Sequence, residues 1–319
     1  MGMVLKDAID TTYNPRYSDA ERRQEVFSGQ IFTFSPTPAS LEFAKFAREM
    51  IEDAFGSLDP RFAQYEMPVE DYVAIVAPLK PRFIHHPRTK GLMAAMLAGI
   101  GCDLAKTYLD VPRLRTVTSD GYLTAGVGYP FPPHRDTWYS APLAQLNFWM
   151  PLYDLTEDST MAFHPSYWDQ PVKNSSRVYN YYEWNANGRA NAAKHIKHDT
   201  RKMPQLEQEV QPQPRSLVDL PPGGFVLFSG AQLHETVPNE EDVARYSIDF
   251  RTVHYDDVVA RRGAPNVDSR CTGTTMRDYL RASDLAHLPD DVVKLYDDGT
   301  EVRSSTLYFG DRLANVTGV

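Results

Sequence analysis

The spacing of apolar residues changes along the chain and divides it into a helical part followed by a β-rich part. Residues 40–56, SLEFAKFAREMIEDAFG, repeat apolar side chains every three or four positions, which predicts an amphipathic helix capped by Ser40 and ended by Gly56. Residues 90–110, KGLMAAMLAGIGCDLAKTYLD, predict a second helix by the same spacing. Residues 1–37 show neither the helical nor the strand period, so we expect them to be irregular.

After Pro112 the apolar period shortens to two, in short segments that are rich in β-branched and aromatic residues and bounded by Gly, Pro and Asp. Strands are predicted over residues 113–118, 122–130, 143–152, 159–163, 224–230 and 245–253. The pattern therefore predicts a mainly β fold with flanking helices. Residues 166–215, between two of these strands, are polar and rich in Asn, Gln and Tyr, which indicates a lid-like insert.

The length of 319 residues suits a single large domain. We expect three parts within it: a mostly helical N-terminal part over residues 1–112, a β core over residues 113–255, and a C-terminal extension over residues 256–319.

Composition narrows the classes of function. A net charge of −9 argues against a nucleic-acid surface and against binding to an anionic membrane. The two cysteines, Cys102 and Cys271, supply neither a disulfide framework nor a sulfur-rich metal site. The N-terminal segment lacks the apolar run of a signal peptide, and no stretch approaches the roughly 20 apolar residues of a membrane helix. We expect a cytoplasmic protein whose partner is a small molecule; its oligomeric state stays open.

Candidate chemistry begins with a His and an Asp one residue apart, His134 and Asp136, behind two prolines. A second such pair, His254 and Asp256, follows near the end of the β core. A metal site and a solvated turn both explain an isolated pair of this kind, because nine histidines make an accidental match common.

The residues downstream distinguish the two pairs. After the first pair, His234 lies just beyond a predicted strand, and Arg245 opens another strand eleven residues later. After the second pair only His287 follows, in a loop-like stretch. Two imidazoles and one carboxylate on one face of a metal form the facial triad of non-haem Fe(II) oxygenases. The first set therefore favours a metal site.

The strand geometry adds two expectations. Side chains at positions i and i+2 of a strand point the same way, so His134 and Asp136 can reach one ion while Arg135 points away. Two predicted strands also have one polar face each, which either meets water or lines a polar cavity. Those faces carry Gln145, Asn147 and Trp149 on one strand, and Arg245, Ser247, Asp249 and Arg251 on the other. An inward Arg requires an anion as its partner.

In this order the motifs resemble the Fe(II)/2-oxoglutarate-dependent oxygenases and, within them, the phytanoyl-CoA dioxygenase-like family, over roughly residues 113–253. The resemblance implies a double-stranded β-helix core, the cupin-like jelly roll. It implies that His134, Asp136 and His234 bind Fe(II) and act in catalysis, with O₂ as the oxidant. It also implies a cosubstrate site for 2-oxoglutarate, made by Arg245 and Ser247 with Gln145, Asn147 and Trp149 beside them. The chain departs from the family at MAFHPSYW, where relatives often carry a Gly-rich turn.

The activity implied by the resemblance is oxidation of a small metabolite, hydroxylation above all, with conversion of 2-oxoglutarate to succinate. Secondary metabolism is the expected setting. A carboxylate at Asp136 argues against halogenation, which uses a small residue there to admit a halide. The alternative is a non-redox metalloenzyme of the isomerase or epimerase type, or a metal-binding protein, on the same barrel. Substrate contacts are expected from Tyr182, Trp184 and Arg251, and Arg251 is a second candidate for the carboxylate clamp. Cations of the insert either meet an anionic substrate or are solvated: Arg189, Lys194, Lys197, Arg201 and Lys202.

Overall fold

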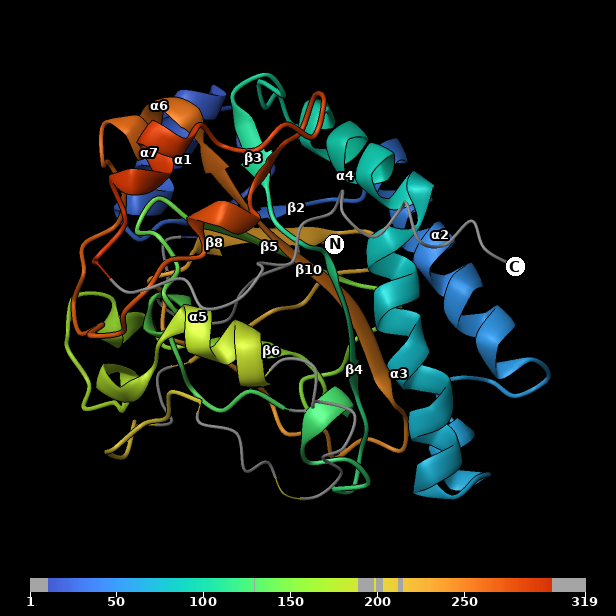
Figure 1. Ribbon diagram of the computed structural model, residues 1–319. Helices are drawn as coiled ribbons and strands as arrows, with labels where there is room; N and C mark the ends of the chain where they lie inside the picture. The colour runs from blue at the N-terminus through green and yellow to red at the C-terminus, as the bar shows by residue number, and fades with distance from the viewer. Residues whose placement is uncertain (1–10, 129, 189–197, 199–202, 212–214, 300–319) are drawn as a thin grey trace.

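A computed structural model describes residues 11–128, 130–188, 198, 203–211 and 215–299. Its largest element is an eight-stranded mixed sheet with the strand order β1-β2-β8-β5-β10-β3-β11, in which β4 also pairs with β10 (Figure 1). These strands are β1 (Thr11–Tyr13), β2 (Ile31–Phe34), β3 (Thr107–Leu109), β4 (Arg113–Val117), β5 (Leu146–Pro151), β8 (Phe225–Ser229), β10 (Arg245–His254) and β11 (Leu280–Arg281). A second sheet has the order β7-β6-β9, formed by β7 (Ser216–Leu217), β6 (Met161–Phe163) and β9 (His234–Thr236).

Helices cover one face of the large sheet (Figure 1). They are α1 (Asp19–Phe27), α2 (Pro38–Phe55), α3 (Val69–His85) and α4 (Pro87–Gly99), while α5 (Tyr181–Glu183), α6 (Tyr255–Val259) and α7 (Asp290–Lys294) are short. The predicted β core with flanking helices is therefore present. The two sheets by themselves do not establish the double-stranded β-helix, and the single-domain division stays a prediction.

Strand β10 separates an apolar core from a polar interior. Tyr246, Ile248 and Phe250 belong to the cluster that packs against helices α2, α3 and α4. Phe250 stacks on Phe148 of β5, with ring centroids 4.7 Å apart and an interplanar angle of 4°. The alternate residues of β10 face the opposite side, as the strand period requires. That side holds the polar side chains that the sequence pattern predicted either to meet water or to line a polar cavity.

The predicted helices form with shifted ends. Helix α2 is capped by Thr37, whose hydroxyl accepts from the Ser40 backbone N–H, so the prediction of Ser40 as the cap is wrong. Pro38 follows at the first helical position, where its missing N–H costs nothing. Gly56 ends the helix with a φ of 65°, as expected. The second predicted helix begins earlier, at Pro87, and stops at Gly99, since Gly101 adopts a φ of 81° and a turn leads to β3.

Three regions differ from the sequence prediction. The described residues of the predicted strand 122–130 form no strand; a 3₁₀ turn covers Gly126–Gly128, and Gly126 has a φ of 64° that a strand does not allow. The segment expected to be irregular contributes β1, α1 and β2. Helix α3 was not predicted, since Pro78 and Pro81 interrupt its pattern. Tertiary packing of its apolar face outweighs the local penalty for proline.

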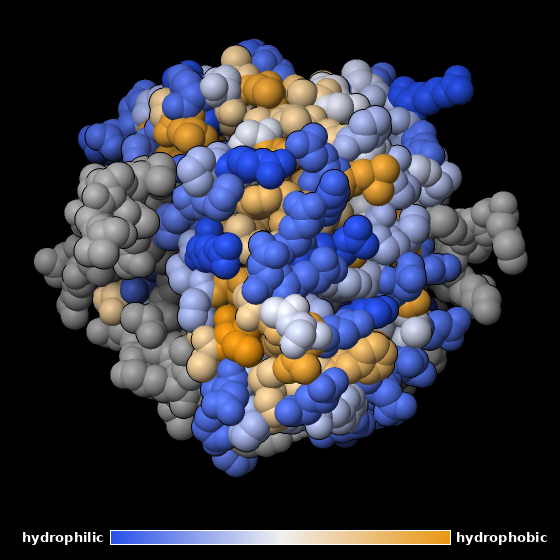
Figure 2. Space-filling model, turned by 90° about the vertical axis from the view of Figure 1, so that its right-hand side faces the viewer, coloured by the Kyte–Doolittle hydropathy of each residue, from blue (hydrophilic) through white to orange (hydrophobic). Residues whose placement is uncertain are grey.

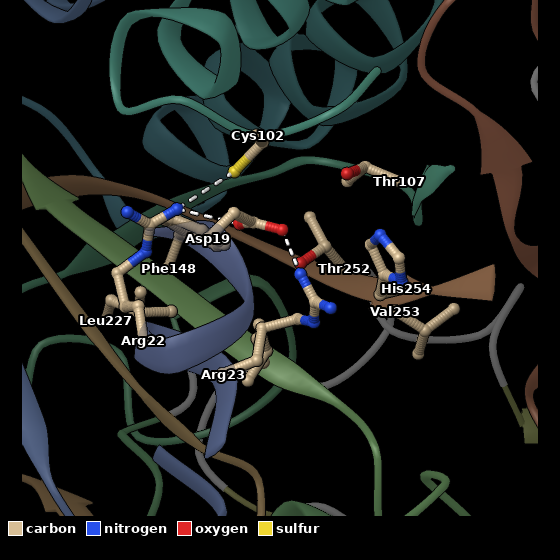
Figure 3. A pocket seen from close by; sticks show the side chains of 11 residues that line it. Asp19, Arg22, Arg23, Cys102, Thr107, Phe148, Leu227, Thr252, Val253 and His254 are labelled. Atoms are coloured by element: carbon tan, nitrogen blue, oxygen red, sulfur yellow. Dashed lines mark hydrogen bonds and ion pairs between the residues drawn. The ribbon is translucent and has the colours of Figure 1, made fainter. Parts of the chain in front are cut away.

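Helix α1 is fixed by buried ion pairs. Arg23 donates from Nε to Asp257 of α6 at 2.6 Å, and Arg22 bonds Asp19 at 2.7 Å. Figure 3 shows the small pocket beside these residues, where Arg22 also points to the Cys102 thiol. Burial raises the pKa of Cys102 to about 12, so the thiol stays protonated. These contacts stabilise the packing of the N-terminal helix.

The surface over the helices is mostly hydrophilic, with apolar side chains scattered among polar ones (Figure 2). Within the described residues, every helix is too short or too polar to span a lipid bilayer.

A pair of glycine substitutions tests the packing of the loop that leads into β5. A Cβ at Gly263 would overlap the backbone of Leu143, whereas Gly91 in α4 has open space around it. We expect Gly263→Ala to lower the free energy of unfolding by roughly 1–3 kcal/mol, the cost of overpacking. Gly91→Ala should raise it by roughly 0.5–1 kcal/mol, because alanine loses less backbone entropy in a helix. Denaturant unfolding of both variants checks the two signs; a neutral Gly263→Ala would contradict the packing.

Candidate metal centre

The backbone brings the two predicted histidine ligands together. His134 and His234 form an antiparallel bridge in which each backbone N–H donates to the other residue's carbonyl oxygen at 2.9 Å. Their imidazole rings lie 4.3 Å apart between centroids. Residues one hundred positions apart in the chain are therefore held in register by two backbone hydrogen bonds.

Asp136 reaches the same point from a 3₁₀ turn. His134 belongs to an isolated bridge and Asp136 opens the turn Asp136–Tyr139, so the prediction that both lie in one strand is wrong. Arg135 between them has extended backbone and turns away, as expected. Its buried guanidinium pairs with Asp268 at 3.1 Å.

The three donor atoms fit one small metal ion. Asp136 Oδ1 lies 3.5 Å from His134 Nε2 and 3.9 Å from His234 Nε2. All three residues are buried, and their ligand atoms lie within 4.8 Å of one another. Metal–ligand bonds of about 2.1 Å place neighbouring ligand atoms roughly 3–4 Å apart. Among the residues that the structure describes, these three are the one set of His, Cys, Asp or Glu side chains whose potential ligand atoms lie this close together.

Each histidine presents the correct nitrogen. His134 Nδ1 lies 2.8 Å from the Pro132 carbonyl oxygen, and His234 Nδ1 lies 2.9 Å from the Gln232 carbonyl oxygen. A carbonyl oxygen only accepts, so Nδ1 carries the proton in both rings. Each Nε2 lone pair is then directed at the shared point. Metal-bound histidines in proteins are held by this kind of contact.

Asp136 is oriented by hydrogen bonds to its other oxygen. Oδ2 accepts from Asn147 Nδ2 at 2.9 Å, from Gln145 Nε2 at 3.0 Å and from Arg251 Nε at 3.1 Å. Oδ1 is left to face the histidines. Gln145, Asn147 and Arg251, predicted as cosubstrate or substrate residues, thus bond the carboxylate in this structure.

Burial and charge at the centre favour the metal-binding forms of Asp136 and His234. Burial alone would raise the pKa of Asp136, but the Arg251 cation holds it well below the ordinary range. Burial, together with the neighbouring His134, lowers the pKa of His234 to about 3, so its imidazole is neutral. An ionised carboxylate and neutral imidazoles are the forms that bind a divalent cation.

Arg245 and Ser247 lie on the same face of β10 as Arg251 and are buried. Arg245 donates to the Thr160 carbonyl oxygen at 3.0 Å and lies over the Trp149 ring at 5.5 Å. Its Nε and the Ser247 hydroxyl have no hydrogen-bond partner in the described part of the chain. Burial and the nearby Arg115 cation lower the pKa of Arg245 to about 10, which still leaves it charged at neutral pH.

The second His-Asp pair forms no such site. His254 accepts from the Asp256 backbone N–H at 3.3 Å and caps α6, while Asp256 is an exposed partner of Lys106 at 2.9 Å. Both side chains thus have local structural roles.

The predicted substrate residues lie in an aromatic group beside the centre. The His134 ring meets Tyr139 edge-on at 5.7 Å, Tyr139 meets Tyr179 at 5.5 Å, and Tyr179 lies 6.3 Å from Trp184. Tyr182 is buried in the same group, and its hydroxyl donates to Asp297 at 3.1 Å. Trp184 is thus two rings away from His134. A role for either residue in substrate binding stays a prediction.

Other predicted residues fall outside the described part of the chain. The insert cations Arg189, Lys194, Lys197, Arg201 and Lys202 belong to this group. Sequence reasoning also missed one side chain near the centre: Tyr279 of the C-terminal extension donates to Gln145 Oε1 at 2.7 Å. No motif marks it, since it lies in a short segment between turns.

No protein-family model matches the chain, and no curated protein matches it either. The phytanoyl-CoA dioxygenase-like assignment therefore stays a prediction.

Solved structures give distant likenesses. EvdO2 from Micromonospora carbonacea var. aurantiaca is 16% identical, over 75% of this chain and 91% of that chain, with a TM-score of 0.43. The epimerase SnoN from nogalamycin biosynthesis is 18% identical, over 74% and 82%, with a TM-score of 0.37. The non-heme monooxygenase ThoJ is 17% identical, over 69% and 71%, with a TM-score of 0.35.

Two of the similar structures contain the groups predicted here: EvdO2 is complexed with 2-oxoglutarate, and SnoN with Fe³⁺ and alpha ketoglutarate. Likenesses this distant show nothing about the chemistry of this chain.

Removing one side chain that donates a hydrogen bond to Asp136 tests whether these bonds support metal binding. Asn147→Ala takes away a donor to Oδ2 and lets the carboxylate rotate. We expect Mn²⁺ or Co²⁺ affinity to fall about 10- to 100-fold, the usual effect of losing such a contact. Calorimetric titration measures it. Asn239→Ala is the matched control, because Asn239 is also buried but bonds backbone carbonyls away from the centre. Equal metal affinity in both variants would contradict this geometry.

Proposed function

We propose that this chain is a non-haem Fe(II)- and 2-oxoglutarate-dependent oxygenase that acts on a small-molecule metabolite. His134, Asp136 and His234 would hold the iron through Nε2, Oδ1 and Nε2. Two imidazoles and one carboxylate leave coordination positions for a bidentate 2-oxo acid and O₂. On this proposal the two sheets form a double-stranded β-helix that encloses the centre.

The observation that carries the proposal is the state of Arg245. Its guanidinium is buried, has an unpartnered Nε, and is next to the unpartnered hydroxyl of Ser247, two residues along the same strand face. Within the described residues, no carboxylate lies at ion-pair distance from it, although Asp249 on the same strand acts on it at longer range. A buried cation in this state is destabilising unless an anion pairs with it. The distal carboxylate of 2-oxoglutarate supplies such an anion.

Arg245 and Arg251 have different roles in this proposal. Arg251 is committed to Asp136 and also pairs with Asp249 at 3.1 Å, so its guanidinium is already neutralised. Those carboxylates raise the pKa of Arg251 against the effect of burial. We therefore assign Arg245 as the carboxylate clamp and Arg251 as a support of the metal ligand.

When bound, iron and 2-oxoglutarate would supply oxidation of the substrate by O₂, with release of succinate and CO₂. The protein supplies the rest: Trp149 flanks the Arg245 guanidinium, and the buried side chains of His134, Asp136 and His234 would keep water from the protein side of the metal. We propose hydroxylation as the outcome. Asp136 occupies its ligand position fully, which leaves no place for the halide that halogenation requires.

Cosubstrate binding tests the proposal. With Fe²⁺ and 2-oxoglutarate under anaerobic conditions, we expect a visible metal-to-ligand charge-transfer band. Arg245→Met should weaken 2-oxoglutarate binding by about two orders of magnitude, because the buried ion pair is lost, while metal affinity changes little. Asp136→Ala should abolish the band at any 2-oxoglutarate concentration. Arg61→Met, a surface change, is the control.

An unchanged band in both Arg245→Met and Asp136→Ala would remove the site assignment. Metal binding without any 2-oxoglutarate binding in the wild-type protein would instead favour a non-redox metalloenzyme.

Turnover tests the reaction type. We expect succinate to form in air with Fe²⁺ and 2-oxoglutarate, and its rate to rise when a substrate is present in a metabolite screen. Mass spectrometry should then find a product 16 Da heavier than that substrate, from insertion of one oxygen atom. A product of unchanged or lower mass would contradict hydroxylation, while the proposed dependence on Fe(II) and 2-oxoglutarate would still stand.

A further inference from the structure

Tyr279 connects the C-terminal extension to the metal carboxylate. It lies between the turn Met276–Asp278 and β11, and its ring packs in a buried cluster that includes Ala144 and Met276. Tyr279 as a whole is 1% exposed, so its hydroxyl requires an internal partner. That partner is Gln145 Oε1 at 2.7 Å, on the segment that enters β5.

The hydrogen bonds that lead from this hydroxyl to Asp136 all have their donor on the Tyr279 side. A carboxylate only accepts, so Gln145 must present Nε2 to Asp136 Oδ2, at 3.0 Å. Nε2 also donates to Asn147 Oδ1 at 2.8 Å, and Asn147 in turn donates to Asp136 Oδ2. Oε1 of Gln145 then faces Tyr279, whose hydroxyl donates. The orientation of both amides is therefore determined by the phenol at one end and the carboxylate at the other.

We propose that Tyr279 is a positioning residue for the metal centre: by bonding Gln145 it fixes the amide that keeps Asp136 Oδ1 directed at the metal. The inference rests on the proposed function, since it assumes that Asp136 binds a metal. Burial and the nearby Asp110 raise the pKa of the Tyr279 hydroxyl well above its ordinary value, so the donor keeps its proton. A chain of hydrogen bonds in one direction strengthens each of its members.

Without the Tyr279 hydroxyl, Gln145 Oε1 is buried with no donor. An amide in that state rotates or shifts to recover a partner, which takes its Nε2 away from Asp136. The metal would then be bound by a carboxylate of less fixed orientation. A role limited to core packing makes a different prediction, because phenylalanine fills the same space.

Binding of Co²⁺ distinguishes these roles, since its visible spectrum reports coordination geometry. We expect Tyr279→Phe to bind Co²⁺ about 10-fold more weakly than the wild-type protein and to shift its visible bands. Tyr246→Phe is the matched control: its hydroxyl is equally buried but bonds Tyr72 and Pro60 on the helix side of β10. It should lower the melting temperature and leave Co²⁺ affinity and spectrum unchanged.

Gln145→Leu interrupts the same path without touching the core position of Tyr279, and it should weaken Co²⁺ binding at least as much. Adding Tyr279→Phe to Gln145→Leu should then have no further effect, because the two residues act in series. Additive losses in the double variant would overturn the inference. A Tyr279→Phe protein with wild-type affinity and spectrum would overturn it while leaving the proposed function intact. A wild-type protein that binds no Co²⁺ would remove both.

Discussion

Three donors converge on one oxygen of Asp136, and the rest of the centre depends on that arrangement. Oδ2 accepts from Asn147, Gln145 and Arg251, so its lone pairs are fully used within the protein. The carboxylate cannot rotate without losing them, and Oδ1 remains directed at His134 and His234. Arg251 also supplies the positive charge that keeps the buried carboxylate ionised. The result is a carboxylate of fixed direction and fixed charge, as a metal ligand would require.

The fold provides this arrangement by placing polar side chains on one face of strand β10 and apolar, packed side chains on the other. Strand β10 directs Ile248 and Phe250 into the helix-covered apolar core. Its alternate residues, on the opposite face, point toward the polar side chains around Asp136. The small sheet then brings His234 opposite His134 through a pair of backbone hydrogen bonds. Since the backbone carries this contact, the position of the ligands depends little on side-chain packing. Polar groups that would destabilise an ordinary core are thus concentrated where a charged cosubstrate can pair with them.

Much of this could be predicted from the sequence, and the exceptions have physical causes. Period-two patterns located β5 and β10, because one face of each strand packs in the apolar core while polar side chains lie on the other. Strand β8 is apolar on both faces and was located by its aromatic and β-branched residues between glycines. The residues downstream of the two His-Asp pairs selected the pair that the fold brings together with His234. Helix α3 was missed because long-range packing outweighs its prolines, and the strand over 122–130 was wrong because Gly126 adopts a positive φ. The link from Tyr279 to Gln145 spans 134 positions and has no local signature.

A crystal structure of the protein loaded anaerobically with Fe²⁺ and 2-oxoglutarate tests the central claim most directly. Our account predicts one ion bound by His134 Nε2, His234 Nε2 and Asp136 Oδ1, with Oδ2 still held by its three donors and the distal carboxylate of the cosubstrate against Arg245. An ion bound through Oδ2, or a cosubstrate carboxylate that pairs with Arg251 in place of Asp136, would contradict it.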